Sequence, residues 1–194
     1  MRVDRGTRRG SNAVIVVSRH IMNPIEPRRR ILLALPLLLT SPAPWALTPA
    51  RAGALLTVSG SSLGPPAADG RAAFDLTALQ QLTQRKIVTA TPWYSAASEF
   101  TGPLLRDVLA AAGAPASVNG TLRCTALNDY RVEIPIDDMR RYGIVVAHLF
   151  NGRPMSVREK GPLFVIYPFD EQPQLRTSTY YNRCIWQLKA IDLA

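Results

Sequence analysis

The sequence predicts an α+β domain with about six or seven strands and three short helices around a strand-rich core. Three observations support this class. Short β-branched and apolar runs recur from residue 55 to residue 191. Helical spacing of apolar residues is confined to brief stretches. The order of these elements mixes hairpins with helices, which is typical of the α+β class.

The first part of this domain is expected to contain two strands and one helix. A strand is predicted at residues 55–59, followed by a loop at residues 60–70 that is rich in Gly, Pro and Ser. Asp75 is a good N-cap for a short helix through Leu82. A second strand at residues 86–89 follows this helix.

The loop after that second strand is the stretch around which the domain is organised. Pro92 cannot continue the strand, so Trp93 and Tyr94 lie in a loop at its end, where ligands tend to bind. After a linker of small residues, Gly102-Pro103 is expected to open an amphipathic helix that Gly113 closes.

The remaining elements are a hairpin, a helical turn and three strands. Residues 121–127 and 131–135 are expected to pair through a turn at Asn128-Asp129-Tyr130. Asp137 and Asp138 begin a short helical turn and are expected to face solvent. Further strands are predicted at residues 144–150, 163–167 and 185–191.

The first 52 residues differ in charge from the rest of the chain. They hold nine of the 23 basic residues and two of the 14 acidic ones. This leaves 14 basic and 12 acidic side chains in residues 53–194, a net charge of +2, whereas the whole chain carries +9. The domain therefore lacks the basic surface of a nucleic-acid binder, and we expect no nucleic-acid partner.

These first residues have the pattern of an export signal. Arg28-Arg29-Arg30 precedes a short apolar run at residues 31–39, and Ala50-Arg51-Ala52 supplies a small-x-small cleavage pattern. The run is too short to span a bilayer. Met22 would begin a signal peptide of ordinary size, so we expect it to be the true start.

We therefore expect residues 1–52 to be a leader and residues 53–194 to be a periplasmic domain that does not span the membrane. Arg28-Arg29 leaves both the Sec and the twin-arginine routes open. Export to an oxidising compartment predicts a disulfide between Cys124 and Cys184, with two buried thiols as the alternative.

Residues for catalysis or metal binding are scarce. His148 is the only histidine after residue 52, and its apolar neighbours favour a core or edge position over a general base. No serine lies in a nucleophile-elbow pattern. Cys124, Cys184 and His148 do not have metal-ligand spacing. We therefore predict no catalytic residue and no metal ligand.

Five stretches occur in an informative order: TPW, FTGPLLRDVLAAAGA, ALNDYRVEIP, NGRPM through GPLFVIYPFD, and YNRCIWQLKAI. Together they resemble the sulfite-oxidase-fold domain that binds molybdopterin in oxidoreductases. The resemblance covers residues 55–194. It implies a single domain of that fold and a pterin-type cofactor.

One departure from the family changes the expected function. The molybdenum enzymes ligate their metal with a cysteine in the loop that here spans residues 89–98, and this loop contains none. The chain is similar to exported members that lack this cysteine, bind a reduced pterin, and act with a membrane receptor controlling cyclic-di-GMP and biofilm formation. The implied partner is the periplasmic domain of an inner-membrane diguanylate cyclase/phosphodiesterase. The alternatives are a molybdopterin-dependent oxidoreductase without the cysteine ligand and a ligand-free structural module.

The resemblance also directs attention to the aromatic and polar residues at strand ends. Trp93 is expected to stack on the pterin, and Asp129 with Asn128 to accept hydrogen bonds from its donor edge. Arg158 or Arg183 would meet the carbonyl O4. The remaining predicted ligand-binding residues are Thr91, Tyr94 and Tyr130.

Each of these roles has an alternative. Trp93 could be a core residue, as could Tyr130, for which the core is the stronger interpretation. Asn128-Asp129 could be a hairpin turn only. The two arginines could be solvated or paired with Asp170 or Glu171.

Overall fold

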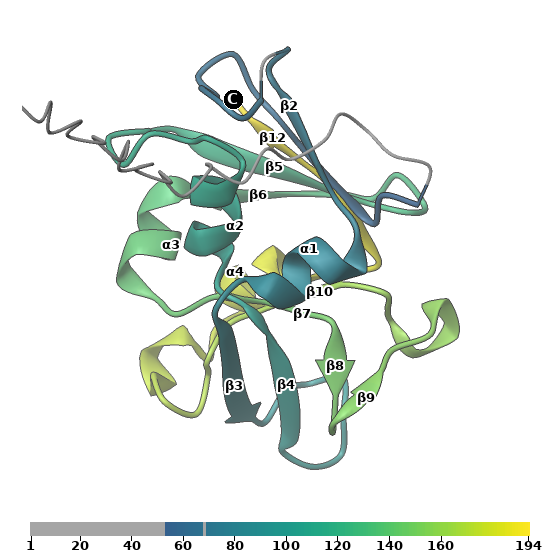
Figure 1. Cartoon of the computed structure of the whole chain (residues 1–194). Helices are drawn as coiled ribbons and strands as arrows, with labels where there is room; N and C mark the ends of the chain where they lie inside the picture. Colours follow the sequence, from purple (N-terminus) through teal and green to yellow (C-terminus); the bar gives the residue numbers. More distant parts are fainter. Residues whose placement is uncertain (1–52, 68) are drawn as a thin grey trace, which may run out of the picture. The chain divides into compact units, whose positions relative to one another are not determined.

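The computed structural model describes residues 53–67 and 69–194. The predicted leader, the start at Met22 and the cleavage pattern lie outside these residues. Within them the chain forms twelve β-strands, four α-helices and two short 3₁₀ helices, and the strands make three sheets (Figure 1). The α+β prediction is confirmed.

The largest sheet has five strands. They are β2 (Arg71–Phe74), β1 (Leu56–Ser59), β12 (Leu188–Leu193), β5 (Thr121–Ala126) and β6 (Arg131–Pro135), in that order across the sheet. β1 and β12 are parallel, and the other pairs are antiparallel. The predicted β5–β6 hairpin is confirmed, whereas β2 was not anticipated.

A four-stranded sheet carries the loop with Trp93. Its strands are β3 (Gln84–Thr89), β4 (Ser98–Pro103), β8 (Leu149–Phe150) and β9 (Arg153–Pro154). The prediction that Gly102-Pro103 opens a helix is wrong, because both residues belong to β4 and pair with β3. A Cβ at Gly102 would lie 2.0 Å from the carbonyl oxygen of Val146, so glycine is required there for the strands to approach closely.

The third sheet contains β11 (Ile185–Trp186), β10 (Phe164–Ile166) and β7 (Val145–Ala147). Two strands that the sequence predicted as continuous are each interrupted where they leave this sheet. The strand expected at residues 144–150 divides at His148, so that β7 and β8 join different sheets. The strand expected at residues 185–191 divides at Gln187, which has a left-handed φ of 55°.

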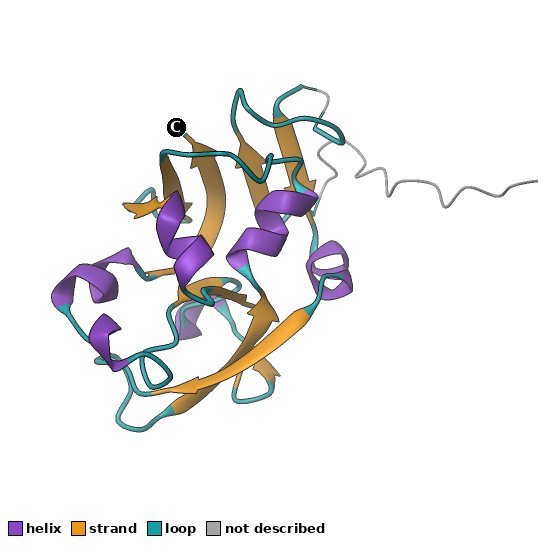
Figure 2. Ribbon diagram, turned by 90° about the vertical axis from the view of Figure 1, so that its left-hand side faces the viewer, coloured by secondary structure: helices purple, strands orange, loops and turns teal. Residues whose placement is uncertain are grey.

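The helices are short and lie against these strands (Figure 2). They are α1 (Leu76–Gln81), α2 (Leu105–Ala111), α3 (Ile136–Arg141) and α4 (Ser178–Arg183), with the 3₁₀ turns η1 (Val157–Glu159) and η2 (Pro173–Leu175). Asp75 caps α1 as predicted, because its carboxylate accepts a hydrogen bond from the backbone N–H of Ala78 at 2.7 Å. Helix α4 was not anticipated. In the described part of the chain, none of these helices is long and apolar enough to cross a membrane.

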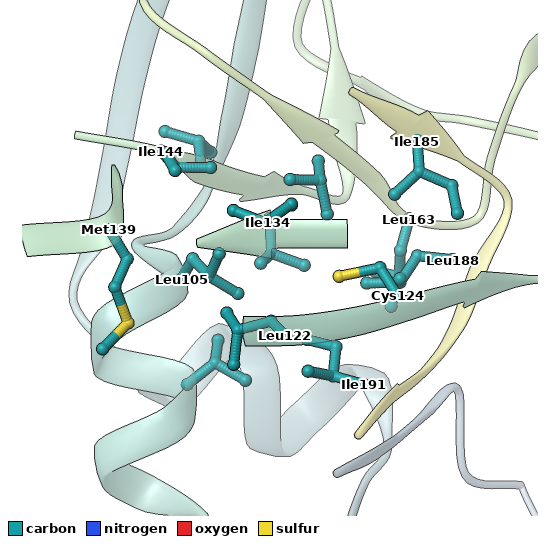
Figure 3. Packing of buried hydrophobic residues seen from close by; sticks show 14 of the residues in the cluster. Leu105, Leu122, Cys124, Ile134, Met139, Ile144, Leu163, Ile185, Leu188 and Ile191 are labelled. Carbon is teal, nitrogen blue, oxygen red and sulfur yellow. The ribbon is translucent and has the colours of Figure 1, made fainter. Parts of the chain in front are cut away.

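The core includes Cys124, which lies among Ile134, Leu163 and Leu188 (Figure 3). Both cysteines are free and buried, so the predicted Cys124–Cys184 disulfide is not formed in the structure. Cys184 also does not lie in a strand, since it follows the last residue of α4. Burial raises the pKa of each thiol to about 12.

Candidate functional site

A cleft of about 270 Å³ opens where three segments meet. The segments are the loop after β3, the β5–β6 turn, and the chain that leads from α4 into β11. The lining residues are Trp93, Asn128, Tyr130, Tyr181, Asn182, Cys184, Ile185 and Trp186. The structure thus brings Trp93 together with Asn128 and Tyr130 of the β5–β6 turn, and all three were predicted for the site from the sequence.

Half-buried aromatic side chains form one wall of this cleft. The Trp93 ring packs 5.8 Å from Trp186 at an interplanar angle of 79°, and 6.1 Å from Tyr181 at 84°. Behind them Phe164 lies 5.8 Å from Trp93 and is fully buried. Edge-to-face packing holds these rings in place while leaving part of their surface accessible. The wall therefore offers a flat heterocycle a preformed apolar surface.

Tyr181 and Trp186 are site residues that the sequence analysis did not select. Trp186 read as a residue of a continuous strand, but the break at Gln187 ends β11 beside the cleft. Tyr181 lies on the unanticipated helix α4. Both lie within the stretch YNRCIWQLKAI, which carries part of the family resemblance. That resemblance was the only sequence signal that pointed to them.

The polar lining of the cleft consists of amides and hydroxyls. Asn128 accepts a hydrogen bond from the backbone N–H of Tyr130 at 3.2 Å through its Oδ1 atom, which stabilises the turn. Asn182 is exposed on the opposite side, on α4. None of the eight lining residues is a carboxylate or a cation.

Asp129 does not line the cleft, contrary to the role predicted from sequence. Its backbone takes a left-handed φ of 65° at the hairpin turn, and its carboxylate accepts a hydrogen bond from the ammonium of Lys189 at 2.7 Å. This hydrogen bond and the lysine charge hold the pKa of Asp129 below its usual range. In this structure the Asp129 carboxylate therefore pairs with Lys189 at the surface instead of lining the cleft.

Arg183 also has a different role from the one predicted. Its Nη1 atom donates to Oδ2 of Asp138 at 2.6 Å, and its guanidinium lies 5.2 Å from the ring centre of Tyr180. Asp138 was expected to face solvent but is buried, and it also accepts a hydrogen bond from the Tyr167 hydroxyl at 2.8 Å. Burial, followed by the charge of Asp138, raises the pKa of Tyr167. This network ties α4 to α3 and to Tyr167, which directly follows β10.

The other predicted site residues lie outside the cleft. Arg158 is exposed on η1. Tyr94 stacks on Phe150 at 4.5 Å, and burial raises its pKa. Thr91 is buried, and its hydroxyl has no hydrogen-bond partner in the described part of the chain. Lys160 places its ammonium 4.9 Å from the Tyr94 ring centre and 5.9 Å from that of Trp186.

The donor groups near the cleft are unsuited to a metal ion. Among residues 53–67 and 69–194, no three His, Cys, Asp or Glu side chains are grouped closely enough to hold one. Cys184 is the sole thiol in the lining, and its Sγ lies 3.6 Å from the carbonyl oxygen of Tyr180. Burial raises the pKa of this thiol to about 12.

His148 is a core residue, as its sequence context indicated. It is buried, and its Nε2 atom forms a hydrogen bond with Oε1 of Gln84 at 2.9 Å. Burial lowers the pKa of the imidazole, which favours the neutral form.

The fold and the cleft together define a domain that can bind a flat heterocyclic cofactor. The chain belongs to the oxidoreductase molybdopterin-binding domain family, whose profile matches residues 73–169. This membership confirms the family that the sequence motifs indicated. A comparison with curated proteins finds no match.

Among solved structures, the sulfane dehydrogenase SoxCD from Paracoccus pantotrophus is similar in fold, with a TM-score of 0.52 at 13% sequence identity. The match covers 76% of this chain and 40% of the SoxCD chain. The chain therefore spans less than half of the protein that it matches.

The residues of the cleft fit one part of molybdopterin better than the other. The aromatic wall and the amides suit the flat, hydrogen-bonding pterin rings. Residues 89–98 contain no cysteine to ligate molybdenum, and Cys184, the one thiol in the cleft lining, is buried with its Sγ against the carbonyl oxygen of Tyr180. The donor set therefore fits a pterin and does not fit a thiolate-ligated molybdenum centre.

Proposed function

We propose that this protein is a periplasmic, non-catalytic pterin-binding protein. In this proposal it signals its ligand state to the periplasmic domain of an inner-membrane diguanylate cyclase/phosphodiesterase receptor, which controls cyclic-di-GMP and biofilm formation. The observation that carries the proposal is the cleft between Trp93, Tyr181 and Trp186 in a domain of the molybdopterin-binding family. Its volume of about 270 Å³ suits a bicyclic ring and lies just below the range typical of drug-sized ligands.

Non-catalytic binding is favoured by the chemistry of the side chains around the cleft. General acid–base catalysis needs a titratable group within hydrogen-bond reach of the ligand. The ionisable lining side chains are tyrosines and the thiol of Cys184, whose pKa is raised to about 12. A reduced pterin would be held and sensed here without being turned over.

We assign the contact with the receptor to exposed apolar side chains beside the cleft. Leu127 and Tyr130 flank the β5–β6 turn and are 44% and 55% exposed. Asn128 and Tyr130 of the same turn line the cleft, so an occupied cleft would change the surroundings of this exposed apolar pair.

Analysis of the protein purified from the periplasm tests the proposal. We expect an extractable fluorescent pterin after oxidation, little molybdenum, and binding of added tetrahydropterin under anaerobic conditions. Stoichiometric molybdenum would contradict the proposal and favour the molybdopterin-dependent oxidoreductase. Absence of both pterin and metal, together with no binding of tetrahydropterin, would leave a structural module.

A further inference from the structure

We propose that Asn182 recognises the lactam edge of the ligand, meaning its N3–H donor and its C4 carbonyl acceptor. The ligand class is then the pteridin-4-ones, and the 2-amino group of a pterin is not required. This inference rests on the proposed pterin-binding function. It specifies which hydrogen-bonding groups of the ligand the cleft recognises.

Asn182 is held on a fixed element but keeps its own amide available. It lies on α4 between Tyr181, which packs against Trp93, and Arg183, which is paired with Asp138. A further contact between the hydroxyls of Tyr142 and Tyr180, at 3.2 Å, anchors the same helix. The Asn182 side chain is exposed and lines the cleft, and its amide has no hydrogen-bond partner among the residues that the structure describes.

An asparagine amide is complementary to a lactam. Its carbonyl oxygen accepts from N3–H while its NH₂ group donates to O4, so two parallel hydrogen bonds form. Asn128 is less suited to this role, because the hydrogen bond that its Oδ1 accepts from Tyr130 fixes its amide within the turn. The NH₂ group of Asn128 remains as an additional donor.

The alternative way to read a pterin uses a carboxylate, which accepts from the 2-amino group and N3–H together. No carboxylate lines the cleft, and Asp129, the nearest in sequence, is paired with Lys189. A 2-oxo ligand, which replaces the amino group with a carbonyl, therefore keeps both hydrogen bonds to Asn182. A ligand methylated at N3 loses one of them and clashes with the amide oxygen.

Anaerobic calorimetric titrations with tetrahydropterin, tetrahydrolumazine and N3-methylated tetrahydropterin test this inference. We expect the first two to bind the parent protein within about threefold of each other, and the methylated probe to bind at least about tenfold more weakly. Asn182→Leu should weaken the first two by about tenfold. Asn119→Leu is the matched control, because Asn119 is an exposed asparagine outside the cleft that pairs with Arg140; it should bind like the parent.

A conservative variant separates recognition from a merely structural effect. Asn182→Asp presents acceptors only, so it should bind tetrahydropterin in preference to tetrahydrolumazine, and thereby create the discrimination that the parent lacks. Thermal unfolding of each variant establishes that α4 is retained.

The outcomes distinguish this inference from the proposed function. If the parent binds tetrahydropterin but rejects tetrahydrolumazine, or if Asn182→Leu binds like the parent, the role of Asn182 is refuted while pterin binding stands. If the parent binds none of the probes, the proposed function fails, and this inference with it.

Discussion

Replacement of Trp93 by alanine tests the aromatic wall directly. The side chain is half-buried and packs against Phe164, Tyr181 and Trp186 at centroid distances of 5.8–6.1 Å. Truncation of a fully buried aromatic costs about 3–5 kcal/mol, so this half-buried side chain should contribute about 2 kcal/mol to the free energy of unfolding. Loss of stacking on the ligand should cost about 1–3 kcal/mol of binding free energy, or about fivefold to 150-fold in Kd.

The assay combines anaerobic titration of tetrahydropterin with urea unfolding of the same preparations. Tyr94→Ala is a matched control, because Tyr94 is the adjacent half-buried aromatic residue but stacks on Phe150 outside the cleft. It should lower stability by a similar amount and leave Kd unchanged within about twofold. Asp129→Asn should also leave Kd unchanged within about twofold, because its carboxylate contacts Lys189 and lies outside the cleft.

Equal weakening of binding by Trp93→Ala and Tyr94→Ala would indicate that both act through general destabilisation. Unchanged affinity in a folded Trp93→Ala protein would refute the stacking role outright. If Asp129→Asn alone abolished binding, the donor-edge role predicted from sequence would be restored.

Three further predictions concern the core. Asp138→Asn should lower the free energy of unfolding by about 3 kcal/mol, because it leaves the charge of Arg183 partly buried without its partner. Urea unfolding measures this change, and a value below about 1 kcal/mol would show that the pair is dispensable. Cys124 and Cys184 should resist maleimide in the native protein and both react after denaturation without reductant, since their pKa values are raised to about 12 and both are buried; fewer than two reactive thiols would indicate a disulfide. The free energy of unfolding should decrease as the pH falls below the ordinary histidine pKa of 6.5, because burial lowers the pKa of His148 and the unfolded chain then binds the extra proton. His148→Gln should reduce this dependence of stability on pH, and an unchanged dependence would exclude His148 as its source.

Local sequence patterns correctly identified elements that are formed by interactions among a few neighbouring residues. The N-cap at Asp75 and the turn at Asn128-Asp129 depend on contacts within three residues, so they were predicted correctly. Pro92 and Trp93 marked the loop that contributes to the cleft, for the same reason. The order of family motifs identified the fold, since it samples the whole domain at once.

Tertiary contacts decided the features that the sequence analysis missed. Gly102 and Pro103 have the composition of a helix start, but they pair with Arg85 and Gln84 of β3 and therefore extend β4. The apolar run around His148 reads as one strand because periodicity carries no information about which sheet each half joins.

The candidate site likewise contains some features that the sequence predicted and others that only tertiary contacts fixed. The sequence by itself placed Trp93, Asn128 and Tyr130 in segments at strand ends, and the structure brings the three into the lining of one cleft. Only the tertiary structure decided that Asp129 turns to Lys189, sixty residues later, and that Arg183 binds the buried Asp138. A charged side chain pairs with whichever opposite charge the fold brings near, and that choice depends on long-range chain packing that local sequence patterns do not encode.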